Sequence, residues 1–318
     1  LGLNKIKLSD VFGVDELHVF NEVLPVPFNH VLLKFNTKCA LSDISFLTGV
    51  TNLWVTRLKD CAFILPKSVV ELRIVNSYRV TVSGTENLMY LSLPDETIET
   101  TPCPKLQRLD WTGNVLSEKK LPFPINDLTT LSEMTLRAGW TTPSFRFPTQ
   151  LKSLKVGVRF GSFDVALLTP LTRLQELTID VDIDKDPLDL SGLTTLSWLD
   201  TNGLPVSRLP TSLVGCQVSL RRNFDFSSFT NLTSLTVKLK SDIEVTFPTG
   251  LKALKMSEGQ LNNTNIGDVA LESFEFWSVP LTLDDLEKLP KTLKGIKGAF
   301  QPKWLKEHLG EIFPLLEF

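Results

Sequence analysis

The stretch Leu232-Thr233-Ser234-Leu235-Thr236-Val237 decides the fold, because its spacing of apolar residues returns along almost the whole chain. The same spacing stands at Leu106-Gln107-Arg108-Leu109-Asp110-Trp111. The unit is L-x-x-L-x-L, and its last three residues run apolar, polar, apolar. This alternation is the period of a β-strand that buries one of its two faces.

We define the second leucine of the unit as the anchor of a repeat, and fifteen anchors follow one another along the chain. The residue three positions before the anchor is apolar in all fifteen repeats. The residue two positions after it is apolar in thirteen, and the exceptions are Thr201 and Gly298. The anchors are Leu17, Val31, Leu53, Leu72, Leu91, Leu109, Met134, Leu154, Leu177, Leu199, Cys216, Leu235, Leu254, Phe274 and Ile296.

The mean distance between anchors is about 20 residues. This leaves too little room for a full helix between two strands, so we expect return segments that are extended, turn-like or a single 3₁₀ turn. One repeat alone has no means of covering its apolar residues, but stacked repeats form a continuous core. The sequence therefore predicts a solenoid of parallel strands that is dominated by β-structure and poor in helix.

Six of the 19 prolines stand at one fixed position in the repeat, six residues before an anchor, which we call their phase. Proline fixes φ and lacks an N–H, so this phase predicts a turn that leads into the strand. In other repeats Leu or Phe holds the same phase, and the rough alternation of the two types indicates a doubled unit of about 40 residues. The prolines are Pro25, Pro66, Pro148, Pro210, Pro248 and Pro290, and the apolar residues are Leu47, Leu128, Leu171, Leu193 and Phe229.

The L-x-x-L-x-L frame over residues 14–298 resembles the leucine-rich repeat superfamily. Its short proline-containing form, L/F-P-T-x-L-x-x-L, is similar to repeats of amoebal leucine-rich repeat proteins and of bacterial secreted effectors. The resemblance implies an α/β fold by family convention: a right-handed, curved solenoid whose parallel sheet lines the concave face and binds proteins or other ligands. The family's asparagine, five residues after the anchor, is present at Asn36 and Asn114 and replaced at Glu96, Gly139, Arg159, Asp182 and Gly259.

Two domains follow from this frame, a repeat solenoid over residues 1–298 and a C-terminal cap over residues 299–318. The cap is expected because apolar residues recur at helical spacing after Pro302, and the open end of a stack needs a cover. These residues are Trp304, Leu305, His308, Leu309, Ile312 and Phe313.

Composition excludes two classes of partner. The 318 residues include 55 leucines and carry a formal net charge of −3, with a pI near 5.8. No global basic field is present, so we expect no nucleic-acid partner. No apolar run reaches the roughly 18 residues of a membrane span, so we expect no membrane insertion.

The sequence offers little material for catalysis, and we expect no enzyme, cofactor or metal site. His18 and His30 should lie on the outward face of neighbouring strands, whereas Cys39 and Cys61 should lie together on the return limbs, so the four do not form a zinc site. Cys39 and Cys61 could form a disulfide or remain two buried thiols. Cys103 and Cys216 occupy inward phases of the core.

An acidic run resembles the opening of a calcium loop at Asp180, Asp182, Asp184 and Asp186. The loop needs a glycine at its sixth position and a glutamate at its twelfth, where this sequence has Lys185 and Ser191. We therefore expect a solvated acidic edge. A basic band from Arg137 to Arg159 precedes it in the sequence.

Residues directly before the anchor, directly after it and three positions after it should point outward. Trp, Tyr and Arg at such positions are the residue types that dominate binding hot spots. The outward residues are His18, Trp54, Arg73, Tyr90, Arg108, Asp110, Glu133, Arg137, Lys155, Glu176, Asp180, Trp198, Asp200, Glu275 and Trp277, and the twelve from Trp54 to Asp200 are the candidate partner-binding residues. Trp111 stands at an inward phase and is expected in the core.

The leading hypothesis is a non-enzymatic module that recognises a protein or peptide on the concave face. One alternative is a secreted or surface adhesin that binds glycans on Trp54, Tyr90 and Trp198. Another is the recognition part of a larger enzyme whose catalytic domain lies outside this chain. Extracellular members of the family usually carry cysteine-rich caps, and this sequence shows none. We therefore expect the cytoplasm, with secretion or the cell surface as the alternative.

Overall fold

The computed structural model describes residues 5–11, 30–35, 44, 47–93, 98–113, 128–138, 146–158, 165–181, 187–239, 243–277 and 282–298. The chain divides into two compact units, unit 1 (Leu1–Leu171) and unit 2 (Thr172–Phe318), and each is described by itself. The expected cap at residues 299–318, His18, Cys39 and the acidic residues 182–186 lie outside the described residues. No helix in the described part of the chain is long and apolar enough to cross a membrane.

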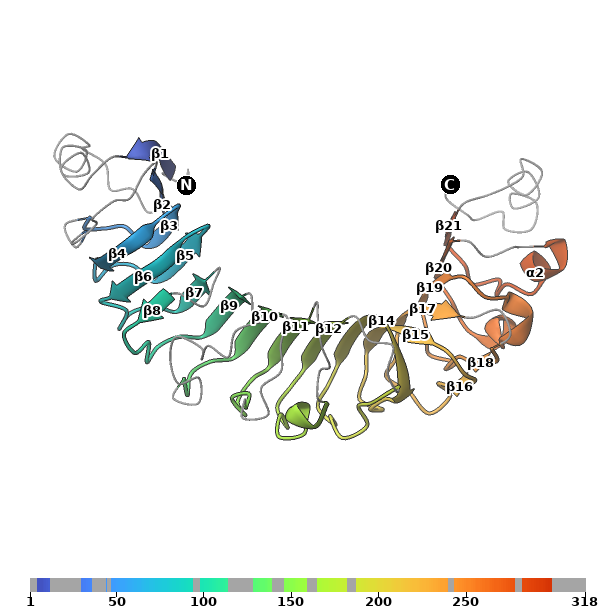
Figure 1. Ribbon diagram of the computed structural model, residues 1–318. Coiled ribbons are helices and arrows are strands. Elements are labelled where there is room, and N and C mark those ends of the chain that lie inside the picture. Colours follow the sequence, from blue (N-terminus) through green and yellow to red (C-terminus); the bar gives the residue numbers. More distant parts are fainter. Residues whose placement is uncertain are drawn as a thin grey trace. The chain divides into compact units, whose positions relative to one another are not determined.

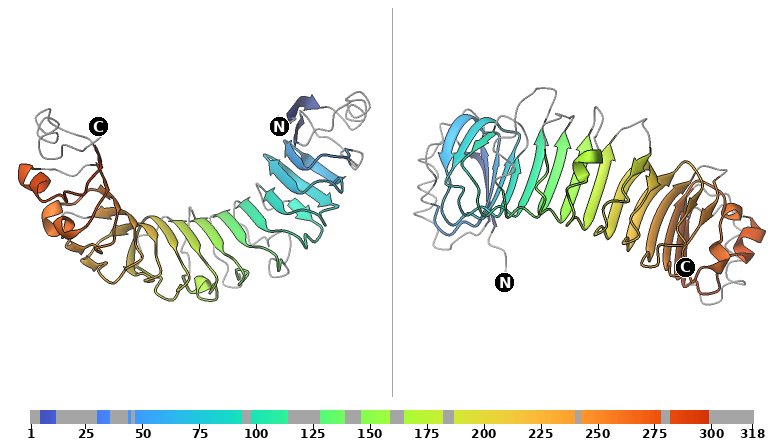
Figure 2. Two further views of the ribbon diagram at one scale, coloured as in Figure 1. Left: turned by 180° about the vertical axis from the view of Figure 1, so that it is seen from behind. Right: turned by 90° about the horizontal axis from the view of Figure 1, so that it is seen from below.

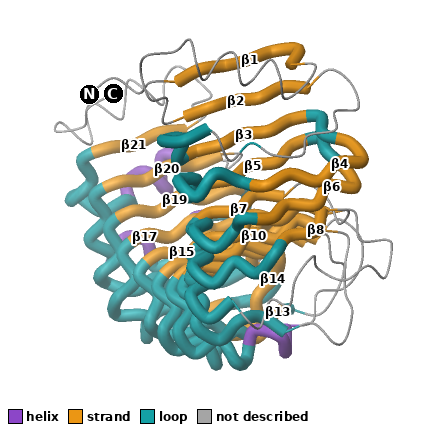
Figure 3. Tube along the Cα trace, turned by 90° about the vertical axis from the view of Figure 1, so that its left-hand side faces the viewer, coloured by secondary structure: helices purple, strands orange, loops and turns teal. Residues whose placement is uncertain are grey.

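Unit 1 contains a long sheet to which successive repeats contribute one parallel strand each (Figure 1). A second, three-stranded parallel sheet lies on the return limbs, where the chain passes from β3 into β4 and from β5 into β6 (Figure 3). The long-sheet strands are β1 (Lys5–Val11), β2 (His30–Phe35), β3 (Asn52–Thr56), β5 (Glu71–Val75), β7 (Tyr90–Leu93), β9 (Arg108–Gly113), β10 (Glu133–Ala138) and β11 (Ser153–Val158). The return-limb elements are β4 (Lys59–Ile64), β6 (Tyr78–Ser83), β8 (Ile98–Thr100) and the 3₁₀ helix η2 (Val165–Leu168).

Unit 2 repeats this arrangement, and its long-sheet strands also lie side by side in chain order (Figure 2). They are β12 (Glu176–Val181), β14 (Trp198–Arg208), β15 (Gly215–Leu220), β17 (Ser234–Leu239), β19 (Ala253–Ser257), β20 (Ser273–Trp277) and β21 (Gly295–Gly298). The return limbs hold β13 (Leu188–Asp189), β16 (Phe224–Asp225), β18 (Val245–Thr246), η3 (Leu261–Asn263), η4 (Ile266–Asp268) and the five-residue helix α2 (Leu283–Glu287). The helix-poor, parallel-strand solenoid predicted from the repeat length is confirmed.

The anchors stand in one row across each long sheet. Leu53 pairs with Leu72, Leu72 with Leu91, and Leu235 with Leu254. All fourteen described anchors are buried, and each buried Leu contributes about 1.5–3 kcal/mol relative to an exposed one. The row of anchors is therefore the spine of the core in both units.

The first predicted anchor is wrong. The strand that pairs with β2 is β1, and the partner of Val31 is Ile6, not Leu17. The neighbour of His30 on β1 is likewise Lys5, so the sheet does not place His18 beside His30. The distance along the chain from Ile6 to Val31 is longer than the mean distance between anchors.

The two exceptions to the inward pattern have local explanations. Thr201 is fully buried, and its Oγ1 donates a hydrogen bond to the carbonyl oxygen of Leu204 at 3.0 Å. Gly298 lies under the ring of Phe276, whose Cζ would be only 2.5 Å from a Cβ at this position. A satisfied hydroxyl and a neighbouring aromatic ring thus replace the missing apolar side chains.

The fixed phase of proline marks a turn, as predicted. The carbonyl oxygen of Pro66 accepts a hydrogen bond from the N–H of Val69 at 3.0 Å, and the other described prolines of this phase accept one in the same way. Where Leu193 holds the phase, its own N–H also donates to Leu190 at 3.0 Å. Proline has no N–H to donate. A proline at this position therefore allows a single turn, whereas a leucine allows two successive turns.

Hydroxyl side chains link neighbouring repeats at the position four residues before the anchor. Thr195 Oγ1 donates to the carbonyl oxygen of Leu174 at 2.8 Å, and Ser212 Oγ donates to that of Leu196 at 2.6 Å. Thr130 and Thr292 bond in the same way to the equivalent carbonyls of their preceding repeats. These bonds satisfy turn carbonyls that the chain would otherwise leave to solvent.

Replacing Thr195 with Val should lower the free energy of unfolding by about 1 kcal/mol, because the shape is kept while one net hydrogen bond is lost. Chemical denaturation monitored by circular dichroism measures the change. Thr195→Ser is the matched control, since Ser212 fills the equivalent position with the same bond. A Ser variant as unstable as the Val variant would contradict the role of the hydroxyl.

Candidate binding face

The outward side chains of the long sheet form what we call the open face. All twelve candidate residues lie on it: nine are exposed, and Tyr90, Asp110 and Asp200 are half-buried. Trp111 is only 3% exposed and belongs to the core, as expected. The structure therefore confirms the outward or inward direction of these residues, while their contact with a partner stays a prediction.

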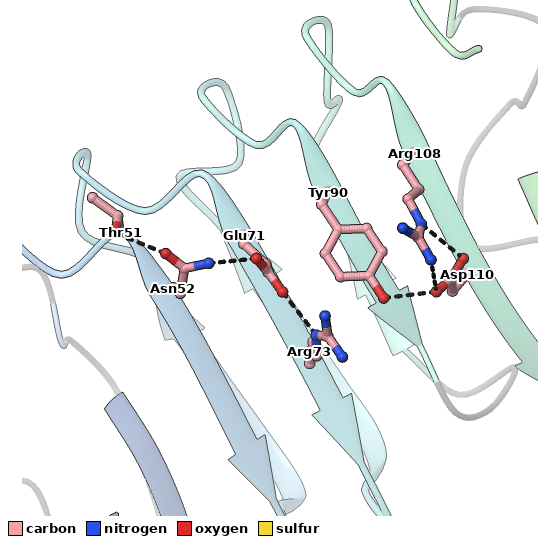
Figure 4. Close-up of polar contacts among 7 residues, drawn as sticks. All are labelled: Thr51, Asn52, Glu71, Arg73, Tyr90, Arg108 and Asp110. Atoms are coloured by element: carbon pink, nitrogen blue, oxygen red, sulfur yellow. Dashed lines mark hydrogen bonds and ion pairs between the residues drawn. The ribbon is translucent and has the colours of Figure 1, made fainter. Parts of the chain in front are cut away.

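An aromatic ring with two guanidinium neighbours lies on the open face of unit 1 (Figure 4). Tyr90 on β7 has the Cζ of Arg73 on β5 and the Cζ of Arg108 on β9 each 4.9 Å from its ring centre. These strands flank β7 on its two sides. Such distances allow cation–π attraction, which is worth about 0.5–1 kcal/mol at exposed sites.

Carboxylates hold the two arginines in place. Arg73 Nε donates to Glu71 Oε1 at 2.8 Å, and Asn52 donates to the other oxygen of Glu71. On the other side, Asp110 accepts from the Tyr90 hydroxyl at 2.7 Å and from Arg108 Nη2 at 3.3 Å. We call Asn52, Glu71, Arg73, Tyr90, Arg108 and Asp110 the Tyr90 cluster.

The cluster shifts the pKa values of three of its members, Tyr90, Arg108 and Asp110. Burial raises the pKa of Tyr90, and the hydrogen bond to Asp110 and its negative charge raise it further, whereas Arg73 opposes the change. Burial would also raise the pKa of Asp110, but the hydrogen bonds from Tyr90 and Arg108 and the charge of Arg108 outweigh it and lower that pKa. At neutral pH the cluster therefore holds a neutral phenol and an ionised carboxylate.

The open face of unit 2 carries a tryptophan in a different setting. Trp198 is 46% exposed, and its six-membered ring lies directly over the backbone of Gly215 on the next strand. A Cβ added at Gly215 would lie 2.3 Å from Cζ3 of that ring. Asp200 accepts a hydrogen bond from the backbone N–H of Asn202 at 2.8 Å, and Asn202 Nδ2 donates to Asp180 at 2.5 Å.

The remaining candidates are exposed charged residues. Arg137 and Lys155 stand on β10 and β11 of unit 1, and the exposed Glu133 at the start of β10 lies 3.8 Å from Arg108. Glu176 begins β12 of unit 2 and is the register partner of Trp198. The predicted basic and acidic bands thus fall in different units, and Arg159 and the acids from Asp182 to Asp186 lie outside the described residues.

The described residues include no group of three or more His, Cys, Asp or Glu side chains that could hold a metal ion. Cys103 and Cys216 are buried thiols. Burial raises the pKa of Cys103 and raises that of Cys216 to about 12, so both thiols are protonated at neutral pH. Cys61 is buried too, but Cys39 lies outside the described residues, so the structure does not distinguish a Cys39–Cys61 disulfide from two buried thiols.

Sequence reasoning missed several residues of these sites. Asn52 and Glu71 precede their anchors directly, as Tyr90 does, so the repeat frame itself could have identified them. Gly215 occupies the same position, but only its contact with Trp198 gives it a role. Val214 is 46% exposed beside this contact, and no periodic signal distinguishes it.

Parallel strands stacked with the L-x-x-L-x-L residues in register define the architecture. The fold is a leucine-rich repeat solenoid. No family model matches the sequence, and no curated protein matches it. Among solved structures, the chain is similar to a leucine-rich repeat protein of Leptospira interrogans, with 15% identity, coverage of 99% of this chain and 89% of that one, and a TM-score of 0.46. It is also similar to CroV588, a circular leucine-rich repeat protein, with 14% identity, coverage of 88% and 55%, and a TM-score of 0.48.

The titration of Tyr90 tests the geometry of the Tyr90 cluster. The chain has two tyrosines, so a Tyr78→Phe background leaves Tyr90 as the sole phenol. In that background Asp110→Asn should lower the pKa of Tyr90, because a negative acceptor is lost, and Arg73→Ala should raise it, because a nearby positive charge is lost. Tyrosinate absorbance against pH measures both shifts. Shifts of the same sign would contradict the arrangement in Figure 4.

Proposed function

We propose that the chain is a non-enzymatic binding module that recognises a protein or peptide partner through the open face of its long sheet. The Tyr90 cluster is the observation that carries this proposal. It presents a tyrosine and two arginines, with the exposed Trp54 beside them, and these residue types dominate the energetics of protein interfaces. The candidate contacts remain the twelve residues from Trp54 to Asp200.

The restraint of the arginine side chains within the Tyr90 cluster supports a binding role. An arginine pays about 0.5–1.5 kcal/mol when an interface immobilises it. Glu71 already restrains Arg73, and Asp110 restrains Arg108, so part of this cost is met before a partner arrives. The ring of Trp54 is 44% exposed, although Arg73 approaches its centre to 6.0 Å.

The geometry favours a protein partner over a glycan at this cluster. A sugar ring stacks on a free aromatic face, but Tyr90 has a guanidinium near its ring from the strands on both sides. Guanidinium and carboxylate groups remain accessible around it, and these suit the charged side chains and backbone groups of a peptide.

Affinity capture with immobilised protein tests the proposal. A triple variant, Arg108→Ala, Arg137→Ala and Trp198→Ala, should lose at least about tenfold of each specific partner measured by quantitative mass spectrometry, because hot-spot residues are removed. Circular dichroism verifies that the variant is folded.

The matched control removes two arginines and one large apolar residue from the return limbs: Ile64→Ala, Arg221→Ala and Arg222→Ala. These residues are exposed away from the long sheet. The control should retain the partners. Partners that survive the open-face variant but disappear with the return-limb control would contradict the proposal.

A further inference from the structure

The aromatic residues of the two units differ in the charges that surround them. In unit 1 the protein supplies its own cations, since Arg73 and Arg108 lie against Tyr90 and Arg73 also approaches Trp54. In unit 2 the exposed Trp277 donates its Nε1–H to Glu275 at 3.0 Å, and Glu275 is paired with Lys255 at 2.8 Å. Trp198 shows neither of these arrangements with the described residues.

The face of Trp198 carries several carboxylates: Glu176 is its register partner on β12, Asp200 is two residues further along β14, and Asp180 lies beyond it beside Asn202. The described strands β12, β14 and β15 contain one basic residue, Arg208, which lies at the far end of β14 and is 3.8 Å from Asp189 on the return limb. The outward residues of these strands around Trp198 are Glu176, Thr178, Asp180, Asp200, Asn202, Gly215 and Gln217. An electron-rich ring thus shares this face with acidic side chains, while the one basic residue of these described strands is paired with a carboxylate on the return limb.

Two of these carboxylates are held in position and keep an acceptor available. Asn202 bonds to one oxygen of Asp180 and to one oxygen of Asp200. The second oxygen of each makes no hydrogen bond or ion pair with the described residues. Carboxylate oxygens of this kind can accept hydrogen bonds from an ammonium or guanidinium group.

The backbone beneath Trp198 restrains its ring. Because Gly215 has no side chain, the indole lies against the backbone of β15, and any Cβ there would displace it. The N–H of Val214 bonds to the carbonyl oxygen of Ser197 at 2.9 Å, which places this exposed apolar residue beside the strand of Trp198. A long aliphatic stem can pack on such a surface while its charged end reaches the carboxylates.

We infer that this face of unit 2 binds a Lys or Arg side chain of a basic peptide segment. The cation lies over Trp198, and Asp180 and Asp200 supply the opposite charge. This inference rests on the proposed function, because it names the chemistry of a partner on the same open face. The charge complementarity on these three strands also steers a basic segment toward the ring before contact.

A fluorescein-labelled hexa-arginine peptide is the probe, and fluorescence anisotropy with the whole chain measures binding. A hexa-citrulline peptide has the same shape without the charge and should not bind. Trp198→Ala should weaken binding of hexa-arginine about tenfold, which is the size of a partly desolvated cation–π contact. Gly215→Ala should weaken it as well, since it displaces the ring without changing any charge.

Two controls match the variants in size and charge. Trp277→Ala removes a tryptophan of similar exposure in the same unit, whose neighbouring Glu275 is already paired with Lys255, and it should leave the affinity unchanged. Asp200→Asn keeps the acceptor for Asn202 and should weaken binding about threefold by loss of charge. Asp268→Asn removes an exposed acid elsewhere in unit 2 and should have no effect.

Equal losses with Trp198→Ala and Trp277→Ala, or equal binding of the citrulline peptide, would overturn the inference. So would a neutral oligosaccharide that displaces hexa-arginine in a Trp198-dependent way, since the face would then be a glycan site. The two proposals fail separately. Partners lost from the open-face variant in the capture experiment, with no Trp198-dependent peptide binding, would overturn only this inference, and the reverse result would overturn only the proposed function.

Discussion

A repeat of about 20 residues has too little chain to enclose its own leucines, so each repeat depends on its neighbours for burial. The row of anchors meets this constraint by register. Leu72, for example, is paired with Leu53 on one side and Leu91 on the other, and all three are almost fully buried. The turns, the hydroxyl bonds between repeats and the short return-limb sheet all serve to bring successive strands into this register.

The same register determines what remains for binding. Since strand side chains alternate, the residues directly before and directly after each anchor have to point away from the core. In unit 1 this places Arg73, Tyr90 and Arg108 on adjacent strands, where they contact one another and their carboxylates. In unit 2 the residue that faces Trp198 on the next strand is Gly215, so the ring spreads over that strand. One backbone pattern thus presents two faces of different chemistry.

Most of the fold could be predicted from the sequence, because burial repeats at a fixed period and Leu, Phe and Pro report that period directly. The first strand could not be predicted. The distance from Ile6 to Val31 is longer than the mean distance between anchors, and Leu17 satisfies the pattern although it is not the residue that pairs with Val31. The direction of each candidate side chain was also predictable. Its partners were not: the pairing of Arg73 with Glu71 and the ring of Trp198 over Gly215 depend on rotamers and on cross-strand neighbours, which carry no periodic signal.

The central claim is that the anchors point inward and the residues beside them point outward, with a register that does not slip. Hydroxyl-radical footprinting read by mass spectrometry tests it on one residue type, because four tryptophans of the described residues occupy the two sides. Trp54, Trp198 and Trp277, which are 44%, 46% and 54% exposed, should oxidise rapidly, and Trp111, which is 3% exposed, should be protected. A shift of one residue reverses the faces of a strand. Oxidation of Trp111 as fast as that of Trp198 would contradict the account.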